Sequence, residues 1–179
     1  RTNARAMELL LAGLVRGDKV SLQADHVKLN RFVDAAAMLK QGKRVVDVPE
    51  LAWFNSWHDV HEYCETNEGS DIKPLVKLVD EHGTDPLKKA LAKITPIAQA
   101  DYIISTAHKA KGLEWDRVHI EDDYQFKLNE KDHKISDEEL RLLYVACTRA
   151  KVSLNIHHIY DLIQQLKIKM PQSLRQAVG

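Results

Sequence analysis

Hydrophobic residues follow a helical period near the start of the chain. Between residues 4 and 15, apolar side chains recur every three or four positions, which predicts an amphipathic helix with Asn3 as its N-cap. Gly13 and Gly17 have low helix propensity, and we expect them to end this helix. The segment Val20–Gln23 alternates in polarity and predicts a short strand.

A second helix is predicted over Val27–Leu39 by a single apolar stripe. The members of the stripe are Leu29, Phe32, Val33, Ala36 and Leu39. Gly42 follows the last apolar position and is the expected C-cap, because glycine accepts a left-handed backbone at low cost.

Residues 45–100 have a different pattern. Three helix-like segments follow one another without a clear strand between them, which predicts a small all-helical insertion. One segment carries a largely aromatic stripe at helical spacing: Trp53, Phe54, Trp57, Val60 and Tyr63. Such a stripe is typical of a small hydrophobic core, and base stacking on a single-stranded nucleic acid is the alternative.

Strand-like patterns return after residue 100. Three segments have this pattern: Tyr102–Thr106, Arg117–Glu121 and Val152–Ile156. A helix is predicted between the last two, over Ser136–Ala150, and strands that alternate with helices favour a parallel α/β sheet. A final helix is predicted to begin near Tyr160 and to close at Pro171.

The predicted helix over residues 136–150 has a start signal and an apolar face. Ser136 and Glu139 have the spacing of a capping box. Four apolar residues should pack on the sheet: Leu140, Leu143, Tyr144 and Cys147. Arg149 lies about 180° around the helix from Leu140, at roughly 100° per residue. It is either a solvated surface residue or a cation that reaches across a domain interface towards a phosphate.

Composition limits the classes of function. The 179 residues are 44% hydrophobic and 29% charged, which is typical of a folded globular protein. A formal net charge of zero argues against a free-standing nucleic-acid-binding protein, but it does not exclude a domain that adds a few backbone contacts beside a partner. No apolar run reaches the roughly 18 residues that a membrane span requires. Because the chain opens on a helical pattern without an initiator methionine, we expect it to be part of a longer protein.

Cysteine and histidine positions predict no metal site. Cys64 and Cys147 lie far apart in unlike contexts, so neither a disulfide framework nor a zinc site follows from them. His58 and His61 have the spacing of a metal-binding pair, but no third ligand is close in sequence, and we expect both to be surface residues.

Three stretches resemble motifs of one enzyme family, the superfamily 1 UvrD/Rep-type DNA helicases. S-T-A-H-K-A-K-G-L-E-W-D-R-V-H-I, at residues 105–120, resembles motif V, and E-L-R-L-L-Y-V-A-C-T-R-A-K, at residues 139–151, resembles motif VI. The opening R-T-N-A is similar to the R-T-N segment of the same domain. The motifs stand in the family's order and cover roughly residues 1–40 and 100–160. The short insertion and the sequence K-A-K-G-L-E, at residues 109–114, are most similar to the F-box DNA helicase branch.

The resemblance implies a RecA-like fold of the P-loop NTPase type, a parallel sheet with flanking helices. The chain would be the second such domain of a helicase, with its core at about residues 1–44 and 101–160 and a reduced 2B-like insertion at 45–100. ATP would bind between it and an N-terminal RecA-like domain, and single-stranded DNA would cross both. The G-x-x-x-x-G-K-[ST] loop of that first domain does not occur in this sequence, and the Mg²⁺ ion would be held mainly there.

The resemblance assigns four residues to the ATP site. Arg149 corresponds to the arginine that senses the γ-phosphate and stabilises the transition state, and is the implied catalytic residue. Glu114 resembles the acidic residue that contacts the ribose, and Lys111 and Gly112 belong to the same stretch.

Five further residues are assigned to single-stranded DNA. Thr106 and His108 resemble the motif V residues that meet the DNA backbone, and Lys109 is a phosphate neighbour on charge alone. Asn3, with Arg1, resembles the DNA-contacting pair of the R-T-N segment.

The sequence therefore predicts the C-terminal motor domain of an ATP-dependent DNA helicase or translocase, which should be inactive without its N-terminal domain. The alternative is a catalytically degenerate relative that binds DNA or a protein without turnover. The location would be nuclear in a eukaryote, and cytoplasmic with the nucleoid in a bacterium or phage.

Overall fold

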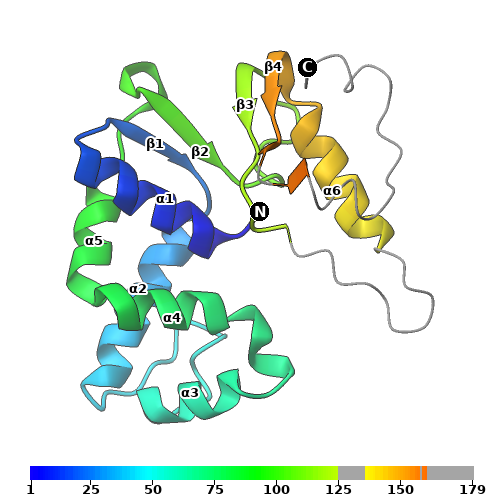
Figure 1. Cartoon of the computed structure of the whole chain (residues 1–179). Helices are drawn as coiled ribbons and strands as arrows, with labels where there is room; N and C mark the ends of the chain where they lie inside the picture. Colours follow the sequence, from blue (N-terminus) through cyan, green and yellow to red (C-terminus); the bar gives the residue numbers. More distant parts are fainter. Residues whose placement is uncertain (125–135, 158, 161–179) are drawn as a thin grey trace. The chain divides into compact units, whose positions relative to one another are not determined.

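Helices and short strands make up the chain in a computed structural model, which describes residues 1–124, 136–157 and 159–160 (Figure 1). The described elements divide into two compact units, one of residues 2–105 and one of Arg1 with the described residues from Thr106 onwards. Each unit has its own hydrophobic core.

The unit of residues 2–105 contains helices and one two-stranded sheet. Its helices are α1 (Asn3–Arg16), α2 (His26–Lys40), α3 (Trp57–Cys64), α4 (Lys73–His82) and α5 (Thr84–Ala92), with 3₁₀ turns η1 (Glu68–Asp71) and η2 (Ile97–Gln99). Its strands are β1 (Val20–Gln23) and β2 (Tyr102–Ser105). The two strands run parallel, with Val20 opposite Tyr102, as parallel strands joined by a long helical connection do.

The first helix begins and ends differently from the prediction. Thr2 is the N-cap, because its side chain accepts a hydrogen bond of 3.2 Å from the backbone N–H of Arg5. The prediction of Asn3 as N-cap was therefore wrong, since the threonine one residue earlier already satisfies a free N–H of the first turn. Gly17 ends α1 with a φ of 87°, as predicted, but Gly13 lies buried inside the helix.

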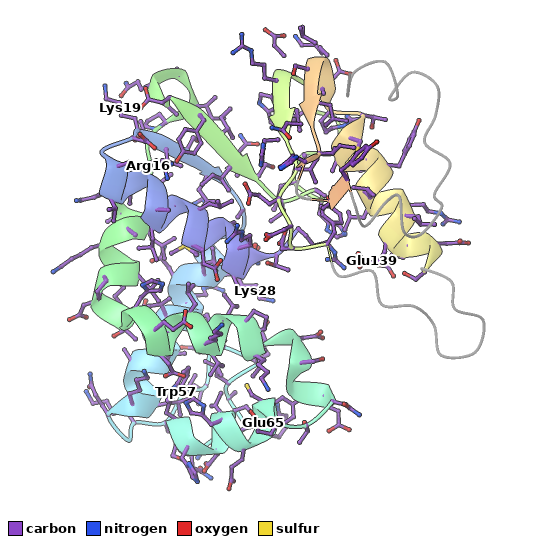
Figure 2. The ribbon with its side chains drawn as sticks, in the orientation of Figure 1. Arg16, Lys19, Lys28, Trp57, Glu65 and Glu139 are labelled. Carbon is purple, nitrogen blue, oxygen red and sulfur yellow. The ribbon has the colours of Figure 1, made fainter. Side chains whose placement is uncertain are left out.

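Gly13 allows α1 to approach the sheet closely. A Cβ atom at this position would lie 2.1 Å from the Tyr102 hydroxyl oxygen and 2.8 Å from Cγ2 of Val20. The Tyr102 hydroxyl lies 3.3 Å from the Asp18 carboxylate and accepts a hydrogen bond of 3.0 Å from Arg16, which is labelled in Figure 2. Only glycine leaves room for this hydroxyl against the helix.

We expect Gly13→Ala to lower the free energy of unfolding by about 1–3 kcal/mol, because the added methyl group overpacks a closed contact. Urea unfolding of the chain, followed by circular dichroism, measures the loss. Tyr102→Phe removes the closest clashing atom but leaves Cγ2 of Val20 in place, so Gly13→Ala should still destabilise the Tyr102→Phe background, but by less. Equal costs of Gly13→Ala in both backgrounds would contradict this account of the contact.

The stripe predicted for α2 lies in the core, with all five of its members buried. Residues 45–100, all of which the structure describes, form helices and turns but no strand. They contribute to the same core through Val60 of α3, Val79 of α4 and Leu87 of α5. Gln41 rather than Gly42 caps α2, and Gly42 follows with a φ of 70°. The predicted domain boundaries at 45 and 100 stay a prediction.

The predicted aromatic stripe is divided between the core and the surface. Trp57 begins α3 and is 9% exposed, whereas Trp53 precedes the helix and is 88% exposed. Phe54 packs against Tyr63 with ring centroids 5.3 Å apart. Helical spacing does not apply to Trp53, because the helix starts only after it.

The carboxylate of Asp80, on α4, is shared by donors from two other helices. It accepts hydrogen bonds from the Trp57 indole at 2.8 Å and from the Lys40 amine at 3.0 Å, and Nε2 of His61 lies 3.1 Å from it. The Lys40 amine also lies over the Trp57 ring, 5.1 Å from its centroid. The carboxylate therefore joins α2, α3 and α4 and satisfies a buried indole N–H.

The second unit contains the elements that surround the motifs. Its described elements are β3 (Trp115–His119), α6 (Asp137–Cys147) and β4 (Ala150–Asn155). The strands β3 and β4 run parallel, with Trp115 opposite Ala150 and Arg117 opposite Ser153. The register shifts between these two pairs, so a bulge lies at the start of β4.

The buried face of α6 is rotated from the prediction. Leu143 and Cys147 are buried as expected, but Tyr144 is 57% exposed, and Leu142 and Ala146 are buried in its place. The predicted stripe was therefore partly wrong. The four buried positions follow the i, i+1, i+4, i+5 pattern, which fits a helical face as well as the predicted spacing does.

Parallel pairing and the α/β class are confirmed, although the described strands form two separate two-stranded sheets. The helix predicted from Tyr160 to Pro171 lies almost entirely outside the described residues. Within the described part of the chain, no helix is long and apolar enough to cross a membrane.

Candidate functional site

The motif V stretch folds into consecutive turns directly after β2. The N–H of Ala110 donates to the carbonyl of Thr106 at 2.9 Å, and the N–H of Leu113 donates to the carbonyl of Ala110 at 3.0 Å. Ala107 belongs to the core of the second unit, and Ala110 is also buried. These two small side chains anchor the turns and leave the polar residues between them at the surface.

The residues assigned to DNA differ in exposure along this loop. His108 and Lys109 are exposed, and so is Lys111. Thr106 is 7% exposed, and its hydroxyl oxygen lies 3.5 Å from the backbone N of Lys109. Direct contact with a backbone phosphate is therefore open to the exposed side chains, while Thr106 supports the turn that presents them.

Gly112 adopts a left-handed backbone, with a φ of 83°, and no atom lies within 4 Å of the place where a Cβ would be. The glycine is favoured here by its backbone conformation, because side-chain space is open. The reversal turns the chain from the loop towards Glu114 and β3.

Arg149 folds back over the C-terminal end of α6. Its Nε donates to the Val145 carbonyl at 2.9 Å, and its Nη2 donates to the Thr148 hydroxyl at 3.0 Å. Its Nη1 donates to the Leu113 carbonyl of the motif V loop at 3.1 Å. A guanidinium group has five N–H donors, so two of them have no partner among the described residues. The cation also lies at the negative end of the helix dipole.

A backbone hydrogen bond joins the motif V and motif VI stretches a second time, and another holds Arg149 to the end of α6. The N–H of Trp115 donates to the carbonyl of Arg149 at 2.9 Å, and the N–H of Arg149 donates to the Ala146 carbonyl at 3.2 Å. The two bonds across the stretches, from the Arg149 guanidinium to Leu113 and from Trp115 to the Arg149 carbonyl, lie on either side of Glu114. The position of Glu114 is thus tied to that of Arg149.

Glu114 is exposed and lies near a second cation. The ammonium of Lys151 is 3.0 Å from the Asp116 carboxylate, and the pKa of Lys151 is raised by Asp116 and, more weakly, by Glu114. Lys151 is the second residue of β4, and Arg149 directly precedes that strand. Arg149 and Lys151 are therefore the two cations that stand where α6 leads into β4.

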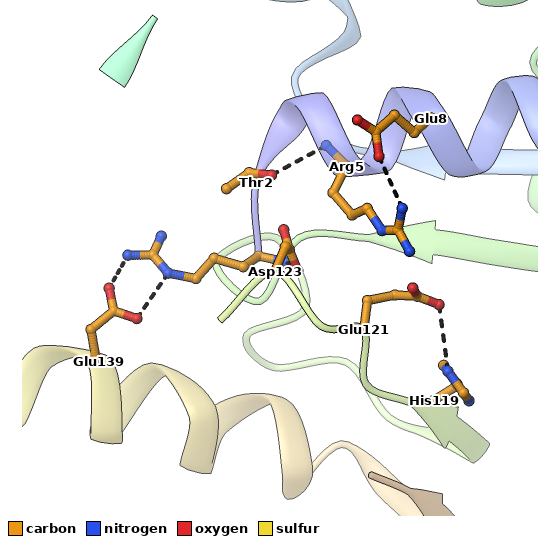
Figure 3. Close-up of polar contacts among 8 residues, drawn as sticks. Thr2, Arg5, Glu8, His119, Glu121, Asp123 and Glu139 are labelled. Atoms are coloured by element: carbon orange, nitrogen blue, oxygen red, sulfur yellow. Dashed lines mark hydrogen bonds and ion pairs between the residues drawn. The ribbon is translucent and has the colours of Figure 1, made fainter. Parts of the chain in front are cut away.

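Arg1 and Asn3, assigned together to DNA, belong to different compact units. The Arg1 guanidinium binds both oxygens of the Glu139 carboxylate on α6, and the dashed lines at the labelled Glu139 in Figure 3 mark these two contacts. Asn3 is the first residue of α1 and is half-buried.

The two stretches that resemble helicase motifs are thus connected by hydrogen bonds in one unit, and a family comparison covers both. The sequence model of the UvrD-like helicase C-terminal domain matches residues 20–160, which is most of the chain. This chain belongs to the UvrD-like helicase C-terminal domain family. The family predicted from the motifs is therefore confirmed.

Two curated relatives of this UvrD-like domain are F-box DNA helicases. The F-box DNA helicase protein 1 of Schizosaccharomyces pombe is 31% identical over 118 residues, which cover 58% of this chain and 13% of the relative. The F-box DNA helicase 1 of Gallus gallus is 39% identical over 79 residues, which cover 36% of this chain and 8% of the relative. The chain thus spans a small part of these relatives. No solved structure matches it significantly.

Sequence reasoning missed two partners in the UvrD-like domain. Glu139 was expected to cap α6, and its pairing with Arg1 joins positions 138 residues apart. Lys151 has no local pattern that distinguishes it from a solvated lysine. Both pairings depend on strand register and chain folding, which local spacing does not encode.

Metal-binding and thiol groups do not form a further site in the described residues. No cluster of three or more His, Cys, Asp or Glu residues there could hold a metal ion. Nε2 of His58 lies 3.6 Å from a carboxylate oxygen of Glu62, and both side chains are exposed. Cys64 and Cys147 are buried and unpaired, and burial raises the pKa of the Cys147 thiol to about 11, so the thiol stays neutral.

Proposed function

We propose that the chain is the second RecA-like motor domain of an ATP-dependent DNA helicase, and that it completes an ATP site with an N-terminal P-loop domain of the same protein. One observation carries the proposal: the Arg149 guanidinium bonds to the Leu113 carbonyl, so the arginine and the loop that carries His108 and Lys109 form one hydrogen-bonded unit. Membership in the helicase family and the parallel strand pairs support it.

In this proposal Arg149 supplies positive charge to the ATP phosphates. Three of its donors hold it in place and two are left for an anion, so the side chain is oriented before the nucleotide arrives. A fixed cation lowers the free energy of developing negative charge without first having to reorganise. Glu114 would contact the ribose, and Gly112 provides the backbone reversal that brings Glu114 beside Arg149.

His108 and Lys109 would meet the DNA backbone from the exposed side of the same turns. Lys111, exposed near the reversal at Gly112, adds charge towards the nucleotide end. The proposal assigns Thr106 to the support of the loop, because its side chain is buried. Asn3 would add a DNA contact from the other unit.

A shift of the Leu113 carbonyl would disturb the Arg149 guanidinium directly, because the two share a hydrogen bond. DNA contact at His108 and phosphate contact at Arg149 are thereby coupled through about one turn of backbone. Such coupling is what a translocating enzyme requires, since closure of the ATP site must change the grip on the strand.

ATP is the substrate in this scheme, and its Mg²⁺ ion neutralises phosphate charge when bound. The N-terminal domain would hold that ion, as the resemblance to the helicase family implies. We further propose a nuclear location, because both relatives come from eukaryotes, a yeast and a bird.

The direct test compares the 179-residue chain with the full-length protein. We expect the chain alone to hydrolyse no ATP, because half of the site lies elsewhere, and the full-length protein to show ATP hydrolysis that single-stranded DNA stimulates. The chain should bind single-stranded DNA weakly, and its affinity should fall as salt rises, since few phosphates are contacted. Full hydrolysis by the isolated chain would contradict the two-domain site. DNA binding without any hydrolysis by the full-length protein would favour the degenerate binding module.

A further inference from the structure

The Glu139 carboxylate points away from the cap that its sequence position predicts. A Glu three residues after a serine N-cap can return to the N-cap backbone and complete a capping box. On α6 the serine half is present, with a hydrogen bond of 3.2 Å from the Glu139 N–H to the Ser136 hydroxyl. The Glu139 side chain instead accepts two hydrogen bonds from Arg1.

The Arg1–Glu139 pair is specific in geometry and partly removed from water. The side chains are 30% and 16% exposed, and Nε and Nη2 of the guanidinium each meet one carboxylate oxygen. The pKa of Arg1 is raised by Glu139 and by the nearby Tyr124 and Asp123. A forked contact of this kind fixes direction as well as distance, which a single lysine ammonium cannot do.

Arg1 and Arg149 act on opposite ends of one short helix. α6 runs from Asp137 to Cys147, with Glu139 in its first turn and Arg149 just past its C-cap, Thr148. Eleven residues of α-helix are about 16 Å long and nearly rigid, so a tilt at one end moves the other.

We propose that Arg1 is a positioning residue that holds the first turn of α6 through Glu139 and thereby sets the direction in which Arg149 faces ATP. This role replaces the predicted contact of Arg1 with DNA, because the guanidinium would have to leave Glu139 to meet a phosphate. The inference rests on the proposed role of Arg149 in ATP hydrolysis.

Four variants of the full-length helicase test the proposal: Arg1→Ala, Glu139→Gln, the double variant and Arg1→Lys. Arg1→Ala and Glu139→Gln should each lower kcat for DNA-stimulated ATP hydrolysis by about tenfold to a hundredfold, since small misplacements of a catalytic group have effects of this size. The Kd for single-stranded DNA should stay unchanged in both. The double variant should be no worse than either single variant, because both remove the same interaction.

Arg1→Lys separates positioning from DNA binding. A lysine keeps the positive charge that a phosphate contact needs but loses the fork that Glu139 accepts. We expect Arg1→Lys to lower kcat nearly as much as Arg1→Ala does. Restored kcat in Arg1→Lys, or a raised Kd for DNA in Arg1→Ala but not in Glu139→Gln, would overturn the positioning role in favour of a DNA contact. Unchanged kcat in all four variants would also overturn it.

Glu138→Gln is the matched control, because Glu138 is exposed in the same turn of α6 and has no pair with Arg1. Assays are run below the thermal midpoint of every variant, so that a loss of kcat reports the site and not the folded fraction. If the wild-type protein has no DNA-stimulated hydrolysis, the proposed function fails. If the wild type is active and Arg149→Ala is inactive while the Arg1 and Glu139 variants are normal, only the positioning role fails.

Discussion

Arg149→Ala in the full-length protein is expected to lower kcat for ATP hydrolysis by about 10³–10⁵-fold, the range found when an arginine that serves a transferring phosphoryl group is removed. The Kd for single-stranded DNA should change little, because His108 and Lys109 remain on the loop. Steady-state hydrolysis with and without single-stranded DNA, together with fluorescence anisotropy of labelled DNA, measures both quantities.

Two further variants make the Arg149 result specific. Arg149→Lys should also fail, because a single ammonium cannot contact the Val145 and Leu113 carbonyls and a phosphate in the way that a planar fork does. Arg141→Ala removes an exposed arginine from the same helix and should leave hydrolysis unaffected. Normal turnover in Arg149→Ala would exclude the assignment of this residue to the ATP site.

Phe32→Ala is expected to lower the free energy of unfolding by about 3–5 kcal/mol, the typical cost of removing a buried phenyl ring. Phe32 is 2% exposed and belongs to the core that α2 shares with the helices of residues 45–100. Urea unfolding of the 179-residue chain, followed by the helical signal in far-ultraviolet circular dichroism, measures this loss.

Val27→Ala provides the control for Phe32→Ala, because Val27 lies on the same helix and is 52% exposed. Its substitution removes little buried area, and we expect a change within about 0.5 kcal/mol, as for most surface positions. Equal costs for the two substitutions would mean that α2 does not hold its stripe against a packed core.

Element type and order could be predicted from the sequence because each depends on local periodicity. The α2 stripe and the Gly17 helix end follow from spacing and backbone preference alone. Where the predictions failed, either a residue distant in sequence or the exact start of a helix decided the outcome. Gly13 lies within the helix, and the hydroxyl of a tyrosine about ninety positions later occupies the space that a side chain would need there. Trp53 is exposed, and α3 begins only after it.

The candidate site could be located from the sequence but not assembled from it. The motif resemblance selected the loop and Arg149, and the structure places the guanidinium on the Leu113 carbonyl. No spacing rule predicts that bond, because it depends on the parallel register of β3 and β4 and on the turn at Gly112. The pairing of Arg1 with Glu139 depends on chain folding in the same way.

The three tryptophans occupy three different surroundings and can serve as built-in optical reporters. Trp57 is buried with its indole N–H bonded to Asp80, whereas Trp53 is almost fully exposed. Trp115 lies in β3, beside the backbone of Arg149, in the unit that carries the motifs. A protein that retains only Trp115 would therefore show, by its emission, whether nucleotide or DNA alters the strand next to Arg149, without any attached dye.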